Sequence, residues 1–156
     1  MALRRILKFD RHEKELRRIS KPVVKFDRRL SSLLDDLLDT LHATDDGAGL
    51  AAPQVGILKR VAVIDFGDGI IELVNPEILE TEGEAEYEEG CLSLPGKRGK
   101  TIRPNYVKVK TFNRAGIESV IEGHDIMALA LVHEIGHLNG ELFIDFVTGD
   151  LWEVEG

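Results

Sequence analysis

The chain has a single cysteine and lacks long apolar runs, and each of these features excludes a class of protein. Its 156 residues include one cysteine, so no disulfide can form within the chain, which favours a reducing cytoplasm. No apolar run approaches the length of a membrane span, so we expect no contact with a membrane. The first residues are basic but lack a long apolar stretch and a small-residue cleavage site, so no secretory signal is expected.

Basic residues are outnumbered by acidic ones. Lys and Arg number 20 against 28 Asp and Glu, which gives a formal net charge of −8. This balance argues against a general affinity for nucleic acid, and we expect no specific nucleic-acid partner, although a local basic patch is not excluded. The hydrophobic content of 43% and the length indicate one globular domain, residues 1–156, with a buried core.

The spacing of apolar residues predicts a leucine-rich helix followed by strands. From Arg28 to Ala43, six leucines recur at helical spacing and form one apolar stripe, with Asp27 as the expected N-cap. The segments RVAVIDF and IIELVN predict two strands joined by a glycine turn and closed by Pro76. YVKVKTF and IESVIEG predict a second hairpin.

The end of the chain predicts a second helix. The segment DIMALALVHEIGHLNG has a helical pattern that stops at Gly140. The order of elements predicts an α+β fold, with mixed or antiparallel strands packed around this C-terminal HExxH-bearing helix and with the leucine-rich helix near the N-terminus. Between the strands, the glutamates from Glu80 to Glu88 fall at period two, on one solvated face of an extended segment. EGCLSLPGKRGKTIRP is interpreted as a loop.

The C-terminal helix carries two histidines one turn apart. His133 and His137 project from the same face and predict a metal clamp. Glu134 lies about 100° further around the helix, where it could take a proton from bound water but not ligate the metal readily. Two imidazoles on an otherwise apolar helix would be costly to bury without a partner. A catalytic site of this kind needs a third protein ligand.

That third ligand is not found after the clamp. Extended zinc-protease motifs place a third histidine where this chain has Phe143, and few residues remain for a glutamate on a further helix. His12, His42 and His124 have no supporting motif and are interpreted as surface residues. Cys91, bounded by glycine and proline, could bring a thiolate to the metal and complete a site of two histidines and one cysteine with an open fourth position.

Three motifs together resemble those of a known enzyme family. GAGLAAPQVG, EGCLSLPG and HEIGHLNG, in this order, are similar to the signature motifs of the peptide deformylases, and the likeness covers most of the chain. The resemblance implies a cytoplasmic metal-dependent hydrolase that removes the formyl group from N-formyl-methionyl nascent peptides, releases formate, and meets the ribosome transiently. It also implies one divalent metal ion, typically Fe2+, with Zn2+, Ni2+ or Co2+ able to occupy the same site.

The resemblance assigns the chemistry to particular residues. The implied metal ligands are Cys91, His133 and His137. Glu134 matches the catalytic carboxylate, which takes a proton from water activated by the metal and returns it to the leaving amine. The family commonly has Asp where this chain has Gly136, a departure that would affect turnover and metal retention rather than the reaction type.

The resemblance also assigns residues to the oxyanion and the substrate. Gln54 and the backbone N–H of Leu92 match the two donors that bind the developing oxyanion. A strand edge would pair with the peptide backbone, and a pocket beside the C-terminal helix would receive the methionine side chain. The residues implied to contact the substrate are Ala48, Gly49, Gly90, Arg98, Leu129 and Ala130.

Two alternatives remain open at this stage. A zinc peptidase could use the same clamp with another third ligand, in which case Cys91 would be dispensable for metal binding. A non-enzymatic module could bind formylated N-termini without hydrolysing them, which Gly136 supports and the intact Glu134 opposes. The sequence gives no indication of the oligomeric state.

Overall fold

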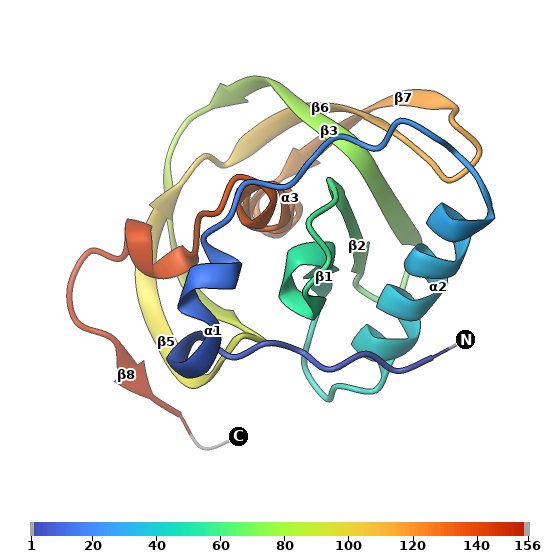
Figure 1. Ribbon diagram of the computed structural model, residues 1–156. Coiled ribbons are helices and arrows are strands. Elements are labelled where there is room, and N and C mark those ends of the chain that lie inside the picture. Colours follow the sequence, from blue (N-terminus) through green and yellow to red (C-terminus); the bar gives the residue numbers. More distant parts are fainter. Residues whose placement is uncertain (1, 155–156) are drawn as a thin grey trace.

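A computed structural model describes residues 2–154 and shows two antiparallel sheets around one helix (Figure 1). The helices are α1 (Phe9–Leu16), α2 (Arg28–His42), α3 (Ile126–Leu138) and the short 3-10 turns η1 (Ala52–Val55) and η2 (Phe143–Phe146). The five-stranded sheet contains, in spatial order, β1 (Gly49–Ala51), β2 (Val61–Asp65), β3 (Ile70–Glu82), β6 (Tyr106–Phe112) and β7 (Glu118–His124). The three-stranded sheet contains β4 (Ala85–Cys91), β5 (Leu94–Arg103) and β8 (Trp152–Glu153). The predicted α+β class is confirmed, whereas α1 was not anticipated.

Helix α2 forms where the leucine spacing predicted it. The carboxylate of Asp27 accepts a hydrogen bond from the backbone N–H of Leu30 at 3.2 Å and so caps the first turn. Leu34 and Leu37 are fully buried and pack in one cluster with side chains of β1 and β2. Full burial of a leucine side chain contributes about 1.5–3 kcal/mol, so this stripe attaches α2 firmly to the sheet.

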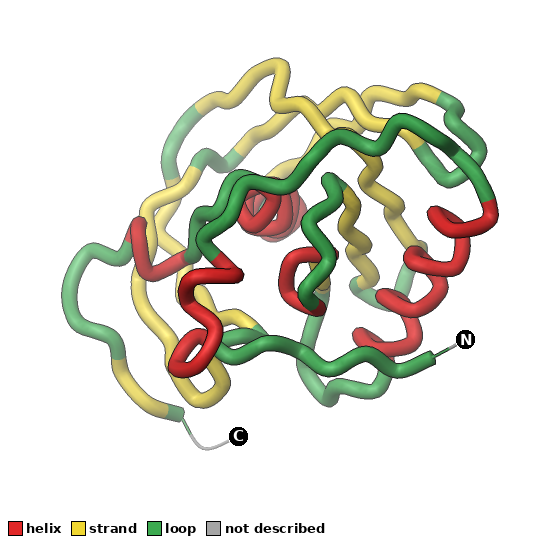
Figure 2. Tube along the Cα trace, in the orientation of Figure 1, coloured by secondary structure: helices red, strands yellow, loops and turns green. Residues whose placement is uncertain are grey.

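Helix α3 lies in the middle of the molecule. Figure 2 shows it end-on near the centre, with strands of both sheets around it. Leu131 and Leu138 are fully buried in a cluster that includes side chains of β2 and β6. Because the surroundings are apolar, any polar side chain on this helix must find its partners inside the protein. In the described part of the chain, no helix is long and apolar enough to span a membrane.

The predicted strand pairs are confirmed, but one strand is longer than expected. β2 pairs with β3 and β6 with β7, both antiparallel. The prediction that Pro76 closes the strand is wrong, because β3 continues to Glu82. The register shifts between Val74 and Glu77, and Asn75 has a φ of 49°, so Pro76 occupies an irregularity. A strand tolerates the missing N–H of proline at such a bulge.

The run of glutamates does not lie on a single extended segment. Glu80 and Glu82 belong to β3, whereas Glu86 and Glu88 belong to β4 in the other sheet. Gly83 lies between the two strands with a φ of 67°, a conformation that favours glycine. The expectation of one continuous face is therefore wrong, although the exposure of these side chains agrees with the solvated interpretation.

The cysteine segment is also more regular than expected. The interpretation of EGCLSLPGKRGKTIRP as a loop is wrong, because the segment forms the end of β4, a tight turn and β5. Across this pair, Gly90 lies opposite Arg98 and Cys91 lies opposite Leu94. The cysteine is thus held at the end of a hydrogen-bonded strand, which fixes its position better than a free loop would.

Candidate metal centre and active site

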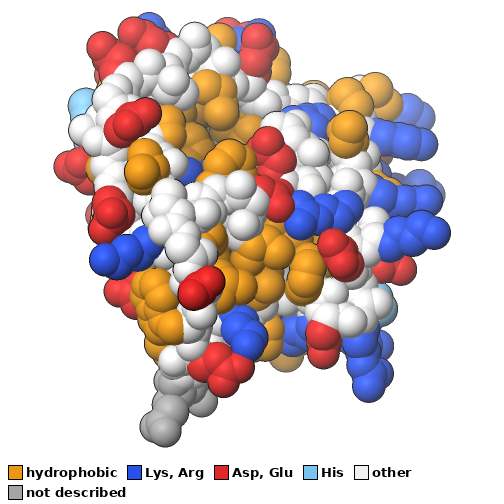
Figure 3. All heavy atoms as spheres, turned by 90° about the vertical axis from the view of Figure 1, so that its left-hand side faces the viewer, with side chains coloured by type: hydrophobic (Ala, Val, Ile, Leu, Met, Phe, Trp, Pro, Cys, Tyr) orange, Lys and Arg blue, Asp and Glu red, His pale blue; other side chains and the backbone are white. Residues whose placement is uncertain are grey.

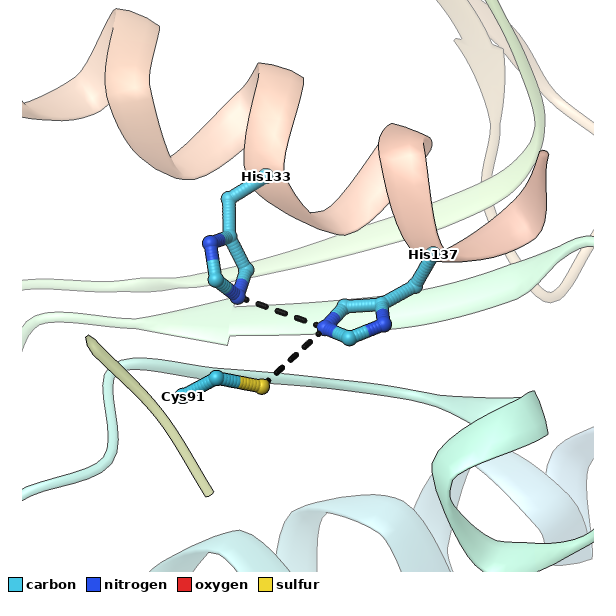
Figure 4. A group of neighbouring side chains, drawn as sticks. All are labelled: Cys91, His133 and His137. Atoms are coloured by element: carbon cyan, nitrogen blue, oxygen red, sulfur yellow. Dashed lines mark hydrogen bonds between the residues drawn. The ribbon is translucent and has the colours of Figure 1, made fainter. Parts of the chain in front are cut away.

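Two histidines of α3 and the cysteine at the end of β4 converge on one point. The Sγ atom of Cys91 lies 3.3 Å from Nε2 of His137, and that nitrogen lies 3.3 Å from Nε2 of His133. All three ligand atoms lie within 4.8 Å of one another. Figure 4 shows both rings extending from the helix toward the sulfur. The structure therefore brings together the three residues that the sequence pointed to as ligands.

A buried carboxylate that the sequence analysis missed holds the ring of His133. Oε2 of Glu89 contacts Nδ1 of His133 at 2.5 Å. The same carboxylate, only 3% exposed, accepts hydrogen bonds from Arg103 at 3.1 and 3.0 Å and from Thr101 at 2.8 Å. A proton held at Nδ1 leaves the lone pair on Nε2, the atom that meets His137, free to bind a metal.

The Glu89 carboxylate that supports His133 is ionised and has hydrogen-bond partners for both of its oxygens. Burial raises the pKa of Glu89, but its hydrogen bonds and charge interactions with His133 and Arg103 outweigh that effect and lower it to about 2. The guanidinium carbon of Arg103 lies 4.0 Å from the centre of the Phe146 ring, which covers it from the other side. Glu89 comes two residues before Cys91 on the same strand, a spacing that could have identified it.

Glu134 lies buried beside the clamp without a full set of partners. It is 4% exposed, and within residues 2–154 its Oε1 atom has no hydrogen-bond partner. Burial raises the pKa of Glu134 to about 7, with the charge of His133 opposing this shift and that of Glu89 adding to it. A carboxylate with a pKa near neutrality is suited to both accepting and returning a proton.

Strand β1 approaches Glu134 so closely that it needs a glycine. A Cβ atom at Gly49 would lie 2.6 Å from Oε2 of Glu134, nearer than any side chain could be placed. β1 is the last strand of its sheet, and among residues 2–154 it pairs with β2 alone, through contacts that include the Asp65 N–H and the Ala48 carbonyl at 2.8 Å. The other edge of β1 can accept the backbone of an extended peptide.

Gln54 in η1 directs its amide toward the cysteine. Its Oε1 accepts a hydrogen bond from the Ala51 N–H at 3.0 Å, and its Nε2 donates to Oγ of Ser93 at 3.1 Å. The same Nε2 lies 3.5 Å from Sγ of Cys91. Leu92 follows the cysteine in the turn between β4 and β5, so its backbone N–H lies on the same short segment. Both predicted oxyanion donors are therefore beside the candidate metal ligands.

Comparison with known proteins agrees with this geometry. The family model described as polypeptide deformylase matches residues 3–150. The chain belongs to this family. Peptide deformylase 1 of Clostridium acetobutylicum is 53% identical over 145 residues, which cover 93% of this chain and 95% of that one. The recognition of the three motifs as those of a peptide deformylase is confirmed, and the family assignment decides against the zinc-peptidase alternative.

Solved peptide deformylases share the fold. The crystal structure of the enzyme from Thermotoga maritima has a TM-score of 0.90 and 39% identity, covering 96% of this chain and all (100%) of that one. The enzyme from Synechococcus elongatus, solved in complex with actinonin, has a TM-score of 0.89 and 35% identity, covering 94% of this chain and 79% of that one. The similarity therefore extends over the whole sheet and helix arrangement that positions the site.

The remaining residues that the deformylase motifs assigned to substrate lie on three elements, β4, β5 and α3. A Cβ atom at Gly90 would lie 3.2 Å from Nη1 of Arg98, so the guanidinium covers the glycine, and Arg98 pairs with Glu88 at 3.3 Å. Leu129 and Ala130 are half-buried on α3, one turn before the clamp, and so share its face. Their roles in substrate binding stay predictions.

The other histidines of this deformylase lie elsewhere. His42 contacts Asp65 at 2.6 Å at the end of α2, and the ring of His124 lies 5.1 Å from that of Tyr106. His12 is on α1. In the described range none of the three joins a cluster of metal-ligating side chains.

Gly136 differs from the usual deformylase motif without reaching the ligands. A Cβ atom there would meet Oε1 and Cβ of Glu141 at 3.4 and 3.6 Å, not the rings of the clamp. The carboxylate that supports His133 comes from Glu89 on β4 instead. Within residues 2–154, Nδ1 of His137 has no hydrogen-bond partner, and the effect of the Gly136 departure on turnover and metal retention stays a prediction.

Replacing Gly136 by Ala should stabilise the protein by about 0.5–1 kcal/mol, because alanine loses less backbone entropy than glycine in a helix and the new methyl group has room. Urea unfolding measures this change, and formate release should be unaffected. Gly140→Ala is the matched control: its φ is 77° and its Cβ would lie against the Arg17 carbonyl, so that variant should be destabilised. Destabilisation of Gly136→Ala would contradict the packing described above.

Proposed function

We propose that Cys91, His133 and His137 hold one divalent metal ion, and that this centre removes the formyl group from N-formyl-methionyl peptides. The chain is a peptide deformylase by family, and such enzymes are metal-dependent hydrolases that act on N-formyl peptides. The observation that carries the assignment of residues is the convergence of one sulfur and two Nε2 atoms beside a buried carboxylate.

The donor set fits a metal ion in spacing. Ligands at the usual sulfur and nitrogen distances from a tetrahedral centre are separated by roughly 3.3–3.6 Å. The distances of 3.3 Å between Cys91 and His137 and between the two histidines agree with this spacing.

The charge of the donor set also fits a metal ion. Burial lowers the pKa of His137, which keeps that ring neutral as a ligand must be. Burial opposes a charge on His133 as well, but hydrogen bonds with Cys91 and Glu89 raise its pKa, so the site favours positive charge that a metal cation could supply in place of the proton. We propose Fe2+ as the native metal, by resemblance to the family, with Zn2+, Ni2+ and Co2+ as ions that the same donors accept.

Removing the charge behind His133 tests the support of the metal centre. We expect Glu89→Gln to weaken metal binding by about 10–100-fold, because the amide cannot hold the proton at Nδ1 as a carboxylate does. Competition with a chelator measures the dissociation constant directly. Glu86→Gln, an exposed substitution on the same strand, is the control, and equal affinities for the two variants would show that Glu89 plays no part.

The proton transfers fall to Glu134. When bound, the metal supplies a Lewis acid that lowers the pKa of water toward about 7. Glu134 takes the proton of the attacking water as the new C–O bond forms at the formyl carbon. It then gives that proton to the amine nitrogen as the C–N bond breaks, so formate and a free N-terminus leave. Its unpaired Oε1 and its pKa of about 7 support this role.

Two donors receive the negative charge that develops on the formyl oxygen. Gln54 contributes its side-chain amide, already oriented by Ala51 and Ser93, and Leu92 contributes its backbone N–H. Because the amide is held before substrate binds, it needs no reorganisation during the reaction. This fixed orientation supports the assignment of Gln54 as an oxyanion donor.

Gln54→Ala should lower kcat by about 10²–10³-fold with metal content unchanged, the usual cost of losing one oxyanion donor. Steady-state formate release and metal analysis of the same sample give both quantities. Activity within a few-fold of the wild type would refute the role of the amide.

The substrate is proposed to bind along β1 and against α3. The open edge of β1 at Ala48 and Gly49 supports pairing with the peptide backbone, and Arg98 beside Gly90 supports a second contact from β5. Leu129 and Ala130 share the face of the clamp and would line the pocket for the methionine side chain, where the small alanine leaves room.

We further propose that residues 1–156 act as one catalytic domain in the cytoplasm. Its substrates are nascent chains, so a transient meeting with the ribosome belongs to the same proposal. A cytoplasmic location would keep the single thiol reduced and able to ligate a metal. The match of the family model to residues 3–150 supports a single unit.

Formate release from formyl-Met-Ala-Ser tests the proposed reaction. Protein purified without oxygen should release formate in proportion to its measured metal content. A chelator should abolish this activity, and added Fe2+ or Ni2+ should restore it. Metal-loaded protein that releases no formate, or that cleaves an internal peptide bond instead, would refute the proposal.

A further inference from the structure

A groove with basic walls runs beside the N-terminal half of α2, formed by residues outside the metal centre. Its volume is about 670 Å³, and its walls include Arg4, Arg28, Arg29 and Lys59. Asp27 is the one carboxylate in the lining. Figure 1 shows that the N-terminal segment and α2, which contribute several of these residues, lie next to each other.

Most of these cationic groups have no partner to neutralise them. Within residues 2–154, Arg28, Arg29 and Lys59 form no ion pair, whereas Arg4 pairs with a buried aspartate at 3.0 Å. The carboxylate of Asp27 is turned to the first turn of α2, where it accepts a backbone hydrogen bond. The groove therefore keeps an excess of positive charge.

This excess is notable in a chain of net charge −8. Residues 1–60 hold 13 Lys and Arg against 9 Asp and Glu, whereas residues 61–156 hold 7 against 19. Figure 3 faces the side of the molecule opposite α2, so it does not include the groove; there too Lys and Arg gather in one place, along the right-hand edge. Charge concentrated in one part of an acidic protein attracts polyanions to that part.

We propose that this groove binds the phosphodiester backbone of RNA. The apolar side chains in its lining are Leu33, which is 5% exposed, and Ile57, which is partly buried, so the lining offers little apolar surface to a lipid bilayer. Its lining contains no aromatic residue on which a base could stack, so binding is through phosphates and independent of sequence. For an enzyme that acts on nascent chains, the RNA closest to its substrate is ribosomal RNA. The identification of the RNA as ribosomal rests on the proposed function, whereas RNA binding itself does not.

Fluorescence anisotropy with a labelled single-stranded RNA of mixed sequence tests the proposal. If about three phosphates are contacted, the logarithm of the association constant should fall with the logarithm of the salt concentration at a slope of about −2. The variant R28Q/R29Q/K59Q should bind at least tenfold more weakly in low salt and lose most of that slope, while its turnover of formyl-Met-Ala-Ser stays at the wild-type level. The variant R28K/R29K should keep the affinity.

The control variant K100Q/K108Q/K110Q makes the same change in net charge on β5 and β6 and should bind RNA like the wild type. If R28Q/R29Q/K59Q does not fold, Lys59→Gln alone should reduce the slope by about 0.7. The proposal would be overturned if the groove and control variants lost affinity equally, or if the groove variant bound RNA like the wild type. It would also be overturned if the wild type bound no RNA in low salt, or bound anionic vesicles in place of RNA. These outcomes are independent of whether formate is released.

Discussion

Glu134→Gln should lower kcat by about 10²–10⁴-fold, the usual contribution of a positioned acid–base group. Glutamine has nearly the same shape as glutamate, so the tight contact with Gly49 and the packing of α3 should be kept. Its amide cannot take a proton from water or return one to the amine. Because Glu134 is not among the converging ligand atoms, the metal should remain bound.

Two measurements on the same sample separate these effects. Formate release at saturating substrate gives kcat, and metal analysis gives occupancy. Glu141→Gln, which changes a neighbouring exposed carboxylate beyond the end of α3, is the matched control and should be fully active. A Glu134→Gln enzyme that retains wild-type kcat would rule out the proposed proton transfers. Loss of metal together with activity would show instead that the carboxylate holds the ion.

Cys91→Ala should remove metal from the purified protein and abolish activity. The substitution deletes the one sulfur among the three converging atoms, and two imidazoles of a single helix would remain. A mononuclear catalytic site ordinarily needs three protein ligands, so the histidine pair should not retain the ion through purification. The side chain contributes little else, since Cys91 is only partly buried at the end of β4, and the fold should persist.

Metal content after anaerobic purification measures this outcome, with circular dichroism to verify the fold. His42→Ala is the control. It removes an exposed histidine that contacts Asp65 and is not one of the three converging side chains, so this variant should keep one metal per chain. A Cys91→Ala protein that keeps stoichiometric metal would contradict the ligand set. It would also mean that another side chain completes the site.

The two longer helices were predictable because their signals are local. The stripe of leucines and the Asp27 cap specify α2 within about four turns of chain, and both are present in the structure. The HExxH spacing likewise specified that His133 and His137 share a face, because helix geometry alone decides it. Neither conclusion needed knowledge of distant parts of the chain.

The errors concern residues whose conformation depends on distant partners. Pro76 lies inside β3 because the bulge opposite β6 removes the need for its N–H, and that register is not encoded near the proline. The glycines after Cys91 suggested a loop, but pairing with β4 makes the segment a strand. In both cases the register of strand pairing overrides the local preference.

The part of the site that sequence reasoning missed is the support behind the ligand. Glu89 was hidden in a run of acidic residues in which every second position appeared solvated, and its own odd position was not considered. Its partners Thr101 and Arg103 lie on β5, so their meeting with Glu89 depends on the β4–β5 register. A motif identifies the ligands, whereas the network that orients them requires the fold.

X-ray absorption at the edge of the bound metal, on protein purified without oxygen, tests the ligand set most directly. We predict one sulfur at about 2.3 Å and two imidazole nitrogens at about 2.0–2.1 Å around the bound metal. A first shell of nitrogen and oxygen without sulfur in the wild-type protein would contradict the account.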